Sequence, residues 1–240
     1  MTGVQTCALP ISAGWALYWL GGLPPLDLFG QTLNPGWVGS VLAAIALVWL
    51  LNLYNFMDGI DGIAGIEAVT VCLGAAFLSA NSDWMLPCTL AAASLGFLVW
   101  NFPRARIFMG DAGSGFLGVT LGVLALYSAN VSPRWLWSWI ILLGVFVDDA
   151  TVTLIRPLWR RERVYQAHRS HAYQHAAQRR GAHWPVTATV AALNLLWLMP
   201  LALLVAAERL DGATGVAIAY VPLIWLALRL DAGVPESTRL

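Results

Sequence analysis

Apolar segments of nearly membrane-spanning length recur along almost the whole chain, and this pattern constrains the fold more than any other feature. A helix that crosses a bilayer needs about 20 consecutive, mostly apolar residues. Runs of this kind lie near residues 8–22, 38–54, 63–80, 85–100, 115–130, 135–154, 186–207 and 213–230. The sequence therefore predicts an all-α, polytopic transmembrane helix bundle of about eight spans, with one integral-membrane domain over residues 13–240.

The composition agrees with burial in lipid rather than in a soluble core. Hydrophobic residues make up 59% of the 240 residues and charged residues only 11%, whereas a soluble domain carries about 25% charged residues. A water-soluble domain of this size has too little interior to hide so much apolar side chain. Most soluble enzymes, disordered proteins and coiled coils are therefore excluded.

Every basic residue is an arginine, and the arginines are unevenly distributed between the two sides of the predicted bundle. If the polar stretch 156–185 lies in the cytoplasm, alternating spans place eleven arginines on that side and only Arg134 and Arg209 on the other. Basic residues concentrate on the cytoplasmic side of membrane proteins. We therefore expect a multi-pass membrane protein whose polar motifs, and with them its active site, face the cytoplasm. The exclusive use of arginine suits a phosphorylated ligand, although GC-rich coding gives the same bias.

The polar motif NFMDGIDGIAG occupies residues 55–65, where a predicted span ends. Asn55, Asp58 and Asp61 are three residues apart, so on a helix they form one polar stripe. Two carboxylates at a helix end can hold Mg²⁺, accept a proton, or accept hydrogen bonds from a nucleobase or sugar. The alternative is a capped, solvated loop, but the asparagine and the spaced glycines favour a functional site.

A second polar motif, NFPRARIFMGDAGSG, spans residues 101–115. A glycine-rich turn that leads into an apolar helix directs backbone N–H groups toward an anion. Asp111 in this turn is placed to bridge a metal ion to phosphate oxygens. Arg104 and Arg106 can neutralise the same anion, or they serve only to set the topology. The motif is not a Walker loop, because GxxxxGK[ST] is absent.

Two adjacent aspartates, Asp148 and Asp149, lie near the cytoplasmic end of a predicted span. Ionisable residues inside a membrane helix are costly and are functional candidates by default. The alternative is that they lie at the interface and pair with Arg156 or Arg160. Of the two aspartates, Asp149 is the better candidate for the site.

A histidine-containing segment, AHRSHAYQH, occupies residues 167–175. His171 and His175 have the spacing of a zinc protease motif, but the glutamate that follows the first histidine in that motif is missing, which argues against a metalloprotease. Histidine together with arginine suits contact with phosphate oxygens, so His168, Arg169 and His171 are candidate phosphate-binding residues. A solvated loop that binds anionic lipid is the alternative.

Together, NFMDGIDGIAG, IFMGDAGSGFLG and AHRSHAYQH, in this order between membrane spans, resemble the polyprenyl-phosphate N-acetylhexosamine-1-phosphate transferases, or glycosyltransferase family 4. The branch that the chain looks most like initiates O-antigen or related cell-envelope polysaccharide synthesis. The resemblance implies an Mg²⁺-dependent glycosyl-1-phosphate transferase, with Mn²⁺ as the alternative ion. In that reaction undecaprenyl phosphate attacks the β-phosphorus of a UDP-N-acetyl sugar, UMP leaves, and undecaprenyl-diphosphate-sugar forms. It also implies contact with membrane lipid, no nucleic acid, and a homodimer as a candidate assembly.

The resemblance assigns roles to the residues already singled out. Asp111 resembles the metal-binding aspartate, with Asp58 as a second ligand, and the first motif resembles an acidic stripe beside the nucleotide and diphosphate. Asn101 and Phe108 resemble the asparagine and the stacking aromatic of a uracil pocket. The expected catalytic residues are Asp58, Asp61, Asp111, His168 and His171, and the expected substrate-binding residues are Asn55, Asn101, Phe108, Arg104, Arg106, Arg169 and Asp149.

The sequence fits two other functional classes less well. Prenyltransferases and CDP-alcohol phosphotransferases resemble aspartate patterns such as NDxxDxxxD or DGxxAR, and residues 55–64 match neither. A membrane transporter places broken helices and buried charges in mid-span, whereas the polar motifs of this chain cluster at one predicted membrane face.

Residues 1–12, MTGVQTCALPIS, differ in character from the rest of the chain. They lack the basic region and the clean apolar run of a signal peptide, and back-translation gives an in-frame string that resembles a sequencing-library adapter. The family's tandem-aspartate motif, which precedes the first motif, is also missing, since Asp148 and Asp149 come after the second motif. We therefore expect residues 1–12 to be a non-native scar and the chain to lack its N-terminal helices.

This expectation predicts that the 240-residue chain is inactive alone, because phosphoryl transfer between two anions needs a complete charge-neutralising shell. Replacing residues 1–12 by the upstream genomic sequence should restore UMP release, measured with Mg²⁺, undecaprenyl phosphate and UDP-GlcNAc. Comparable rates in the two forms would contradict the truncation.

Overall fold

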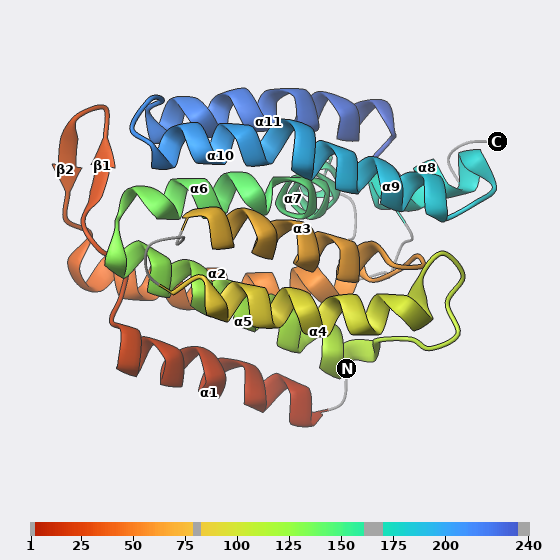
Figure 1. Cartoon of the computed structure of the whole chain (residues 1–240), viewed down its shortest axis with the longest axis horizontal. Coiled ribbons are helices and arrows are strands. Elements are labelled where there is room, and N and C mark those ends of the chain that lie inside the picture. Colours follow the sequence, from red (N-terminus) through yellow and green to blue (C-terminus); the bar gives the residue numbers. More distant parts are fainter. Residues whose placement is uncertain (1–2, 79–82, 161–169, 235–240) are drawn as a thin grey trace.

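The structure, a computed structural model, describes residues 3–78, 83–160 and 170–234. Figure 1 shows a bundle of helices with a small β-hairpin at one end. The elements are α1 (Gly3–Leu20), β1 (Leu26–Leu28), β2 (Gln31–Leu33), α2 (Gly36–Met57), α3 (Ile63–Leu78), α4 (Met85–Asn101), α5 (Gly110–Val131), α6 (Arg134–Leu142), α7 (Gly144–Trp159), α8 (Ala172–Arg180), α9 (Trp184–Leu193), the π-helical η1 (Asn194–Leu198), α10 (Met199–Ala206) and α11 (Gly212–Arg229). The hairpin is antiparallel, with Leu26 opposite Leu33.

The all-α prediction is confirmed, since each predicted apolar run overlaps one helix or consecutive helices. The prediction of eight spans is not confirmed. Among the described residues, four helices are long and apolar enough to cross a membrane, namely α2, α5, the continuous stretch Trp184–Ala206 and α11. The pair α6–α7, bent by 70°, adds a fifth span if it crosses as one unit, whereas α3 and α4 are shorter apolar helices.

The polar stretch predicted over residues 156–185 is also partly helical. Helix α7 continues to Trp159, and α8 occupies Ala172–Arg180. The polar character of residues 172–180 comes from the arginines and glutamines of this short helix.

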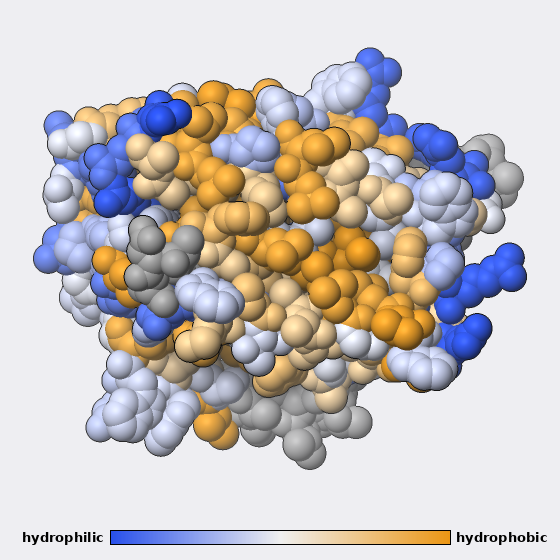
Figure 2. Space-filling view, viewed as in Figure 1, coloured by the Kyte–Doolittle hydropathy of each residue, from blue (hydrophilic) through white to orange (hydrophobic). Residues whose placement is uncertain are grey.

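Apolar side chains cover the outside of the bundle as well as its interior. In Figure 2, apolar residues (orange) gather across the middle of the visible face, and hydrophilic residues (blue) lie toward its two ends. Leu196, Val99 and Phe116 are 77%, 72% and 61% exposed. Soluble monomers rarely expose contiguous apolar surface on this scale. The apolar belt therefore marks the lipid-facing surface of a membrane protein.

The two ends of the bundle carry different connections. In Figure 1 the hairpin and the α10–α11 turn lie at one end, and α8 and the α4–α5 connection lie at the other. The indole N–H of Trp137 donates to the carbonyl oxygen of Asp27 at 3.1 Å and fastens the hairpin to α6. Because α2 to α5 run alternately up and down, the α2–α3 turn and the α4–α5 connection meet at the α8 end. The first two polar motifs are thereby brought to the same end.

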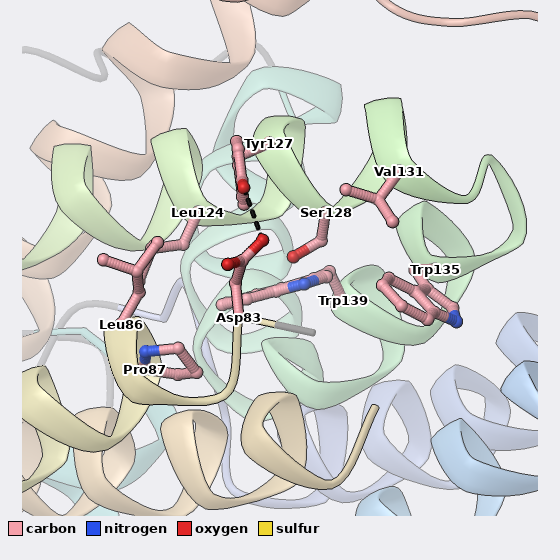
Figure 3. Close-up of a pocket in the computed structure, with 9 residues that line it drawn as sticks. All are labelled: Asp83, Leu86, Pro87, Leu124, Tyr127, Ser128, Val131, Trp135 and Trp139. Carbon is pink, nitrogen blue, oxygen red and sulfur yellow. Dashed lines mark hydrogen bonds between the residues drawn. The ribbon is translucent and has the colours of Figure 1, made fainter. Parts of the chain in front are cut away.

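A small pocket at the hairpin end of the bundle connects α4, α5 and α6 (Figure 3). The Tyr127 hydroxyl donates to the Asp83 carboxylate at 2.5 Å. Trp139 lies on the pocket wall, and its buried indole N–H has no hydrogen-bond partner within the described part of the chain. These contacts hold Asp83, just before α4, against the far end of α5, one helix length away from the polar motifs.

Helices α2 and α5 pack backbone against backbone. A β-carbon on Gly118 would collide with the carbonyl oxygen of Leu50, and one on Gly122 would lie 2.7 Å from a methyl group of Leu47. Small residues at helix interfaces permit this close approach in membranes, where packing rather than the hydrophobic effect holds helices together. The pairing sets the relative position of the first and second motifs, because each motif lies at an end of one of these helices.

We predict that Gly118→Ala destabilises the protein by about 1–3 kcal/mol, because the added methyl group forces the two helix backbones apart. The measurement is thermal unfolding of the detergent-solubilised protein. Gly96→Ala in α4 is the matched control, because a β-carbon there meets no atom within 4 Å. Equal melting temperatures for the two variants would show that the α2–α5 contact does not limit stability.

Candidate active site

A cavity at the α8 end of the bundle brings the first two motifs together. Its open volume is about 710 Å³. The residues that line it are Asn55, Asp58, Gly59, Ile60, Asp61, Asn101, Phe108, Met109, Gly110, Asp111 and His183. Six predicted site residues thus share one cavity, namely Asn55, Asp58, Asp61, Asn101, Phe108 and Asp111.

The prediction that Asn55, Asp58 and Asp61 share one helical stripe is wrong. Helix α2 ends at Met57, Asp58 is its C-terminal cap, and Asp61 lies in the turn before α3. The turn between the two helices closes at Gly62, whose φ of 77° lies in the left-handed region that favours glycine. The three polar side chains still reach the same cavity, but they do so from a helix end and a tight turn.

Asn101 fastens this turn to the second motif. Its amide oxygen accepts a hydrogen bond from the backbone N–H of Gly62 at 2.7 Å, and its amide nitrogen donates to the carbonyl oxygen of Ile107 at 2.8 Å. The side chain is buried. Asn101 therefore positions the α2–α3 turn and the α4–α5 connection relative to each other, and its predicted contact with a nucleobase stays a prediction.

The second motif forms the glycine-rich entrance to a helix, as the sequence predicts. Helix α5 begins at Gly110, which has a φ of 66°, and Asp111 lies exposed in its first turn. The Ser114 hydroxyl, one turn further on, lies 3.3 Å from the amide oxygen of Asn55 and links the two motifs. Phe108 is 82% exposed at the cavity wall, so its ring is free to stack on a planar ligand.

Asp58 is the most desolvated of the three cavity carboxylates. Its burial raises the pKa of the carboxyl group from 3.8 to about 6. Among the described residues, no side chain or backbone group donates a hydrogen bond to this carboxylate. A buried carboxylate without a partner is stabilised by a nearby cation, so the position of Asp58 favours a cationic ligand.

The donor chemistry of the cavity fits a magnesium ion held partly by substrate. Within the described ranges, no group of three or more His, Cys, Asp or Glu side chains is arranged to hold a metal ion by itself. Mg²⁺ in phosphoryl-transfer sites is usually bound by one or two carboxylates together with substrate phosphates. Asp58 and Asp111, which both line the cavity, can supply those carboxylates.

Asp149 caps helix α8 and does not line the cavity. Its carboxylate accepts hydrogen bonds from the backbone N–H groups of Ala172 at 2.9 Å and Tyr173 at 3.0 Å. The predicted alternative, pairing of the aspartates with Arg156 or Arg160, is wrong for Asp149; Arg156 instead donates to the carbonyl oxygen of Ala232 at 2.8 Å. Asp149 therefore holds the histidine-containing segment in place.

The histidine-containing segment lies beside the end of α2. His171 lies 3.3 Å from Asp149 through its Nδ1 atom, and its ring stacks against Phe56 with 6.5 Å between ring centroids. The Tyr173 hydroxyl donates to the carbonyl oxygen of Phe56 at 2.9 Å. A β-carbon on Gly59 would collide with this hydroxyl group. The described part of this segment, residues 170–175, is thus packed against the first motif, next to the cavity rather than inside it.

Two further predicted residues, Arg104 and Arg106, are described but do not line the cavity. Arg104 and Arg106 are exposed on the α4–α5 connection. His168 and Arg169 lie outside the described residues, so their predicted contact with phosphates stays a prediction.

The sequence analysis missed His183. This residue lines the cavity, and its Nδ1 atom lies 3.2 Å from a carboxylate oxygen of Asp61. Thr187, one helical turn further on, donates to the carbonyl oxygen of Asp61 at 2.8 Å. A weak signal was present, since His183 directly precedes Trp184-Pro185, a helix start at the end of the polar stretch. Nothing in the local sequence, however, indicates that this helix start faces Asp61.

The profile described as Glycosyl transferase family 4 matches residues 3–129 of the chain. This stretch contains both motifs that line the cavity. The chain belongs to glycosyl transferase family 4. The resemblance inferred from the three motifs is therefore confirmed at the level of the family, while the branch within it is not specified.

Two curated relatives agree with this assignment. The chain is 38% identical over 91 residues to a probable undecaprenyl-phosphate N-acetylglucosaminyl 1-phosphate transferase of Bacillus subtilis, covering 37% of the chain and 25% of that protein. It is 37% identical over 150 residues to a phospho-N-acetylmuramoyl-pentapeptide-transferase of a Synechococcus strain, covering 61% of the chain and 43% of that protein. The chain thus spans less than half the length of these family 4 relatives.

We predict that Asp149→Asn loosens the start of α8. The asparagine amide has one oxygen that can accept a hydrogen bond, so its NH₂ group faces the backbone N–H of either Ala172 or Tyr173 and that hydrogen bond is lost. Hydrogen–deuterium exchange of the Ala172 and Tyr173 amides should accelerate at least about 10-fold, the scale of a lost buried hydrogen bond. Asp148→Asn is the matched control, because this buried neighbour accepts no hydrogen bond from the described residues. Unchanged exchange in Asp149→Asn would contradict the capping role.

Proposed function

We propose that this protein transfers an N-acetylhexosamine-1-phosphate group from a UDP-sugar to undecaprenyl phosphate. The products are undecaprenyl-diphosphate-sugar and UMP. The observation that carries the proposal is the cavity in which Asn55, Asp58 and Asp61 of one motif meet Phe108 and Asp111 of the other. Membership of family 4 and the activities for which its relatives are named agree with this reaction.

The cavity suits a reaction that depends on positioning. The nucleophile is a lipid phosphate that is largely ionised near neutral pH, so little proton removal is needed. The reacting phosphates repel each other, and their alignment and neutralisation set the rate. In this proposal Asn55 and Asp61 contact the nucleotide sugar from one wall, and the exposed ring of Phe108 stacks on the uracil from the other.

Asp111 and Asp58 are the residues proposed to hold Mg²⁺, or Mn²⁺ in its place. When bound, the ion would supply charge neutralisation for the phosphate oxygens. The exposed position of Asp111 at the first turn of α5 leaves its carboxylate accessible to an ion and to substrate. A bound cation would offset the cost of keeping the partly buried Asp58 carboxylate charged.

The cavity end is proposed to face the cytoplasm of a bacterial inner membrane. Two described arginines, Arg104 and Arg106, lie on the α4–α5 connection at this end, and Arg179 and Arg180 end α8. Arg134 and Arg209 lie at the hairpin end, where they line a separate polar cavity. This distribution supports the positive-inside orientation. UDP-sugars are cytosolic, so this orientation gives the site access to its substrate.

The physiological product is proposed to be the first lipid-linked sugar of an O-antigen or a related cell-envelope polysaccharide. In this proposal the segment containing His168, Arg169 and His171 contacts phosphates from the side of α8. A homodimer is part of the same proposal.

A transporter is the second candidate, because two described features fit it. The pair α6–α7 is bent by 70°, and Glu67 is fully buried within α3. Transporters bind substrate in mid-membrane at such breaks. The cavity with the polar motifs, however, lies at the end of the bundle, which favours the transferase. Uptake and transfer assays on the same membranes separate the two functions.

The decisive experiment is product analysis with undecaprenyl phosphate, Mg²⁺ and a panel of UDP-N-acetyl sugars, performed with and without restored upstream sequence. The expected result is UMP release and a lipid-diphosphate-sugar detected by mass spectrometry. Failure to form such a product with any sugar, in either form, overturns the proposed function.

We predict that Asp111→Asn abolishes this transfer and that Asp58→Asn and Asp61→Asn each lower it at least about 10²-fold, the scale of a catalytic group. Thermal stability should be unchanged or higher in Asp58→Asn, because a desolvated charge is removed. Asp83→Asn, at the opposite end of the bundle, should keep normal turnover. Near-normal turnover in Asp111→Asn would remove this residue from the metal site.

A further inference from the structure

The cavity has an unbalanced charge among the described residues that line it. Asp58, Asp61 and Asp111 contribute three carboxylates, and His183 is the one lining side chain in the described ranges that can carry a positive charge. The substrate of the proposed reaction adds a negatively charged diphosphate. Besides a metal ion, the described cavity wall therefore offers one protein group with which to attract that diphosphate.

The geometry leaves one nitrogen of this imidazole for a ligand. The Nδ1 atom of His183 lies 3.2 Å from a carboxylate oxygen of Asp61 and 3.5 Å from the Asp61 backbone nitrogen. The carboxylate contact is the shorter and involves a charged acceptor, so we assign a proton to Nδ1 that is donated to the carboxylate. No described residue bonds to Nε2, and the side chain is 46% exposed.

The imidazole is also held at a defined position. His183 immediately precedes α9, and Thr187 within α9 donates to the carbonyl oxygen of Asp61 at 2.8 Å. Two contacts one helical turn apart thus fix the start of α9 to the α2–α3 turn. A group held by such supporting contacts meets a substrate with little loss of conformational freedom.

We propose that His183 is a substrate-binding residue that acts as an imidazolium with both ring nitrogens protonated: Nε2–H donates to the diphosphate of the nucleotide sugar, while Nδ1–H donates to the Asp61 carboxylate, which orients the ring. This inference rests on the proposed function and assigns a diphosphate contact to a histidine outside the three motifs. It also gives Asp61 a second task, the orientation of the imidazole.

Two substitutions separate the two ring nitrogens. His183→Asn retains an amide donor near Nδ1, so it can still bond to Asp61, but it lacks a group at the position of Nε2. His183→Gln reaches the position of Nε2 with its amide. The measurement is calorimetric titration of the purified chain with UDP and with uridine, in buffer that contains Mg²⁺.

The expected result is that His183→Asn weakens UDP binding about 10-fold to 100-fold, the scale of a hydrogen bond to a charged group, with unchanged binding of uridine. His183→Gln should retain UDP binding closer to that of the unchanged chain. Because each dissociation constant reports only folded protein, partial unfolding of a variant does not alter the comparison of UDP with uridine.

Other outcomes overturn the inference in distinguishable ways. If His183→Asn binds UDP as the unchanged chain does, or if UDP and uridine binding weaken equally, His183 does not contact the diphosphate and the proposed function stands. If the unchanged chain binds neither UDP nor uridine, the proposed nucleotide site fails, and the role of His183 fails with it.

Discussion

The bilayer forces backbone hydrogen bonds to be satisfied inside helices, and the rest of this structure depends on that constraint. Unpaired N–H and C=O groups are too costly in hydrocarbon, so the turns and connections between helices lie at the ends of the bundle, while η1 and the α6–α7 bend are departures within helical segments. The turn between α2 and α3 and the connection between α4 and α5 are two of these end connections. The ends of the helices are also where backbone groups and carboxylates can face water-soluble ligands. The cavity proposed as the active site accordingly lies at an end of the bundle.

Irregular backbone at the site has to be held by side chains instead of by helix geometry. Asn101 bonds to Gly62 and Ile107, Tyr173 bonds to the end of α2, and Thr187 bonds to Asp61. These contacts come from three different helices, α4, α8 and α9. Removal of any one of these side chains leaves a backbone N–H or C=O group without its hydrogen-bond partner. The site is therefore sensitive to substitutions outside the two motifs that line the cavity.

A cluster of three buried polar side chains, Glu67, Thr70 and Asn194, lies away from the cavity and stabilises helix packing. The amide nitrogen of Asn194 donates to the Glu67 carboxyl group at 2.6 Å and lies 2.7 Å from the Thr70 hydroxyl oxygen. Asn194 begins the π-helical segment η1, so this contact joins the irregular turn of that helix to α3. Hydrogen bonds between membrane helices specify their register, because any other pairing leaves polar atoms exposed to hydrocarbon. The hydrogen bond from Asn194 gives the buried Glu67 carboxyl group a role in helix packing, and the proposed reaction does not use this group.

The sequence by itself determined the helical membrane fold, the family, and most residues of the cavity, because apolar runs and short polar motifs are local signals. It misjudged the helical stripe of the first motif, since the glycine turn after Met57 responds to tertiary packing against α8 and Asn101. Only the tertiary structure decided that Asp149 caps α8, with partners 23 and 24 residues away. It alone decided that His183 meets Asp61 across 122 residues. The physical reason is that these contacts join separate helices, whose relative placement is fixed by glycine-mediated packing and buried hydrogen bonds rather than by neighbouring residues in the chain.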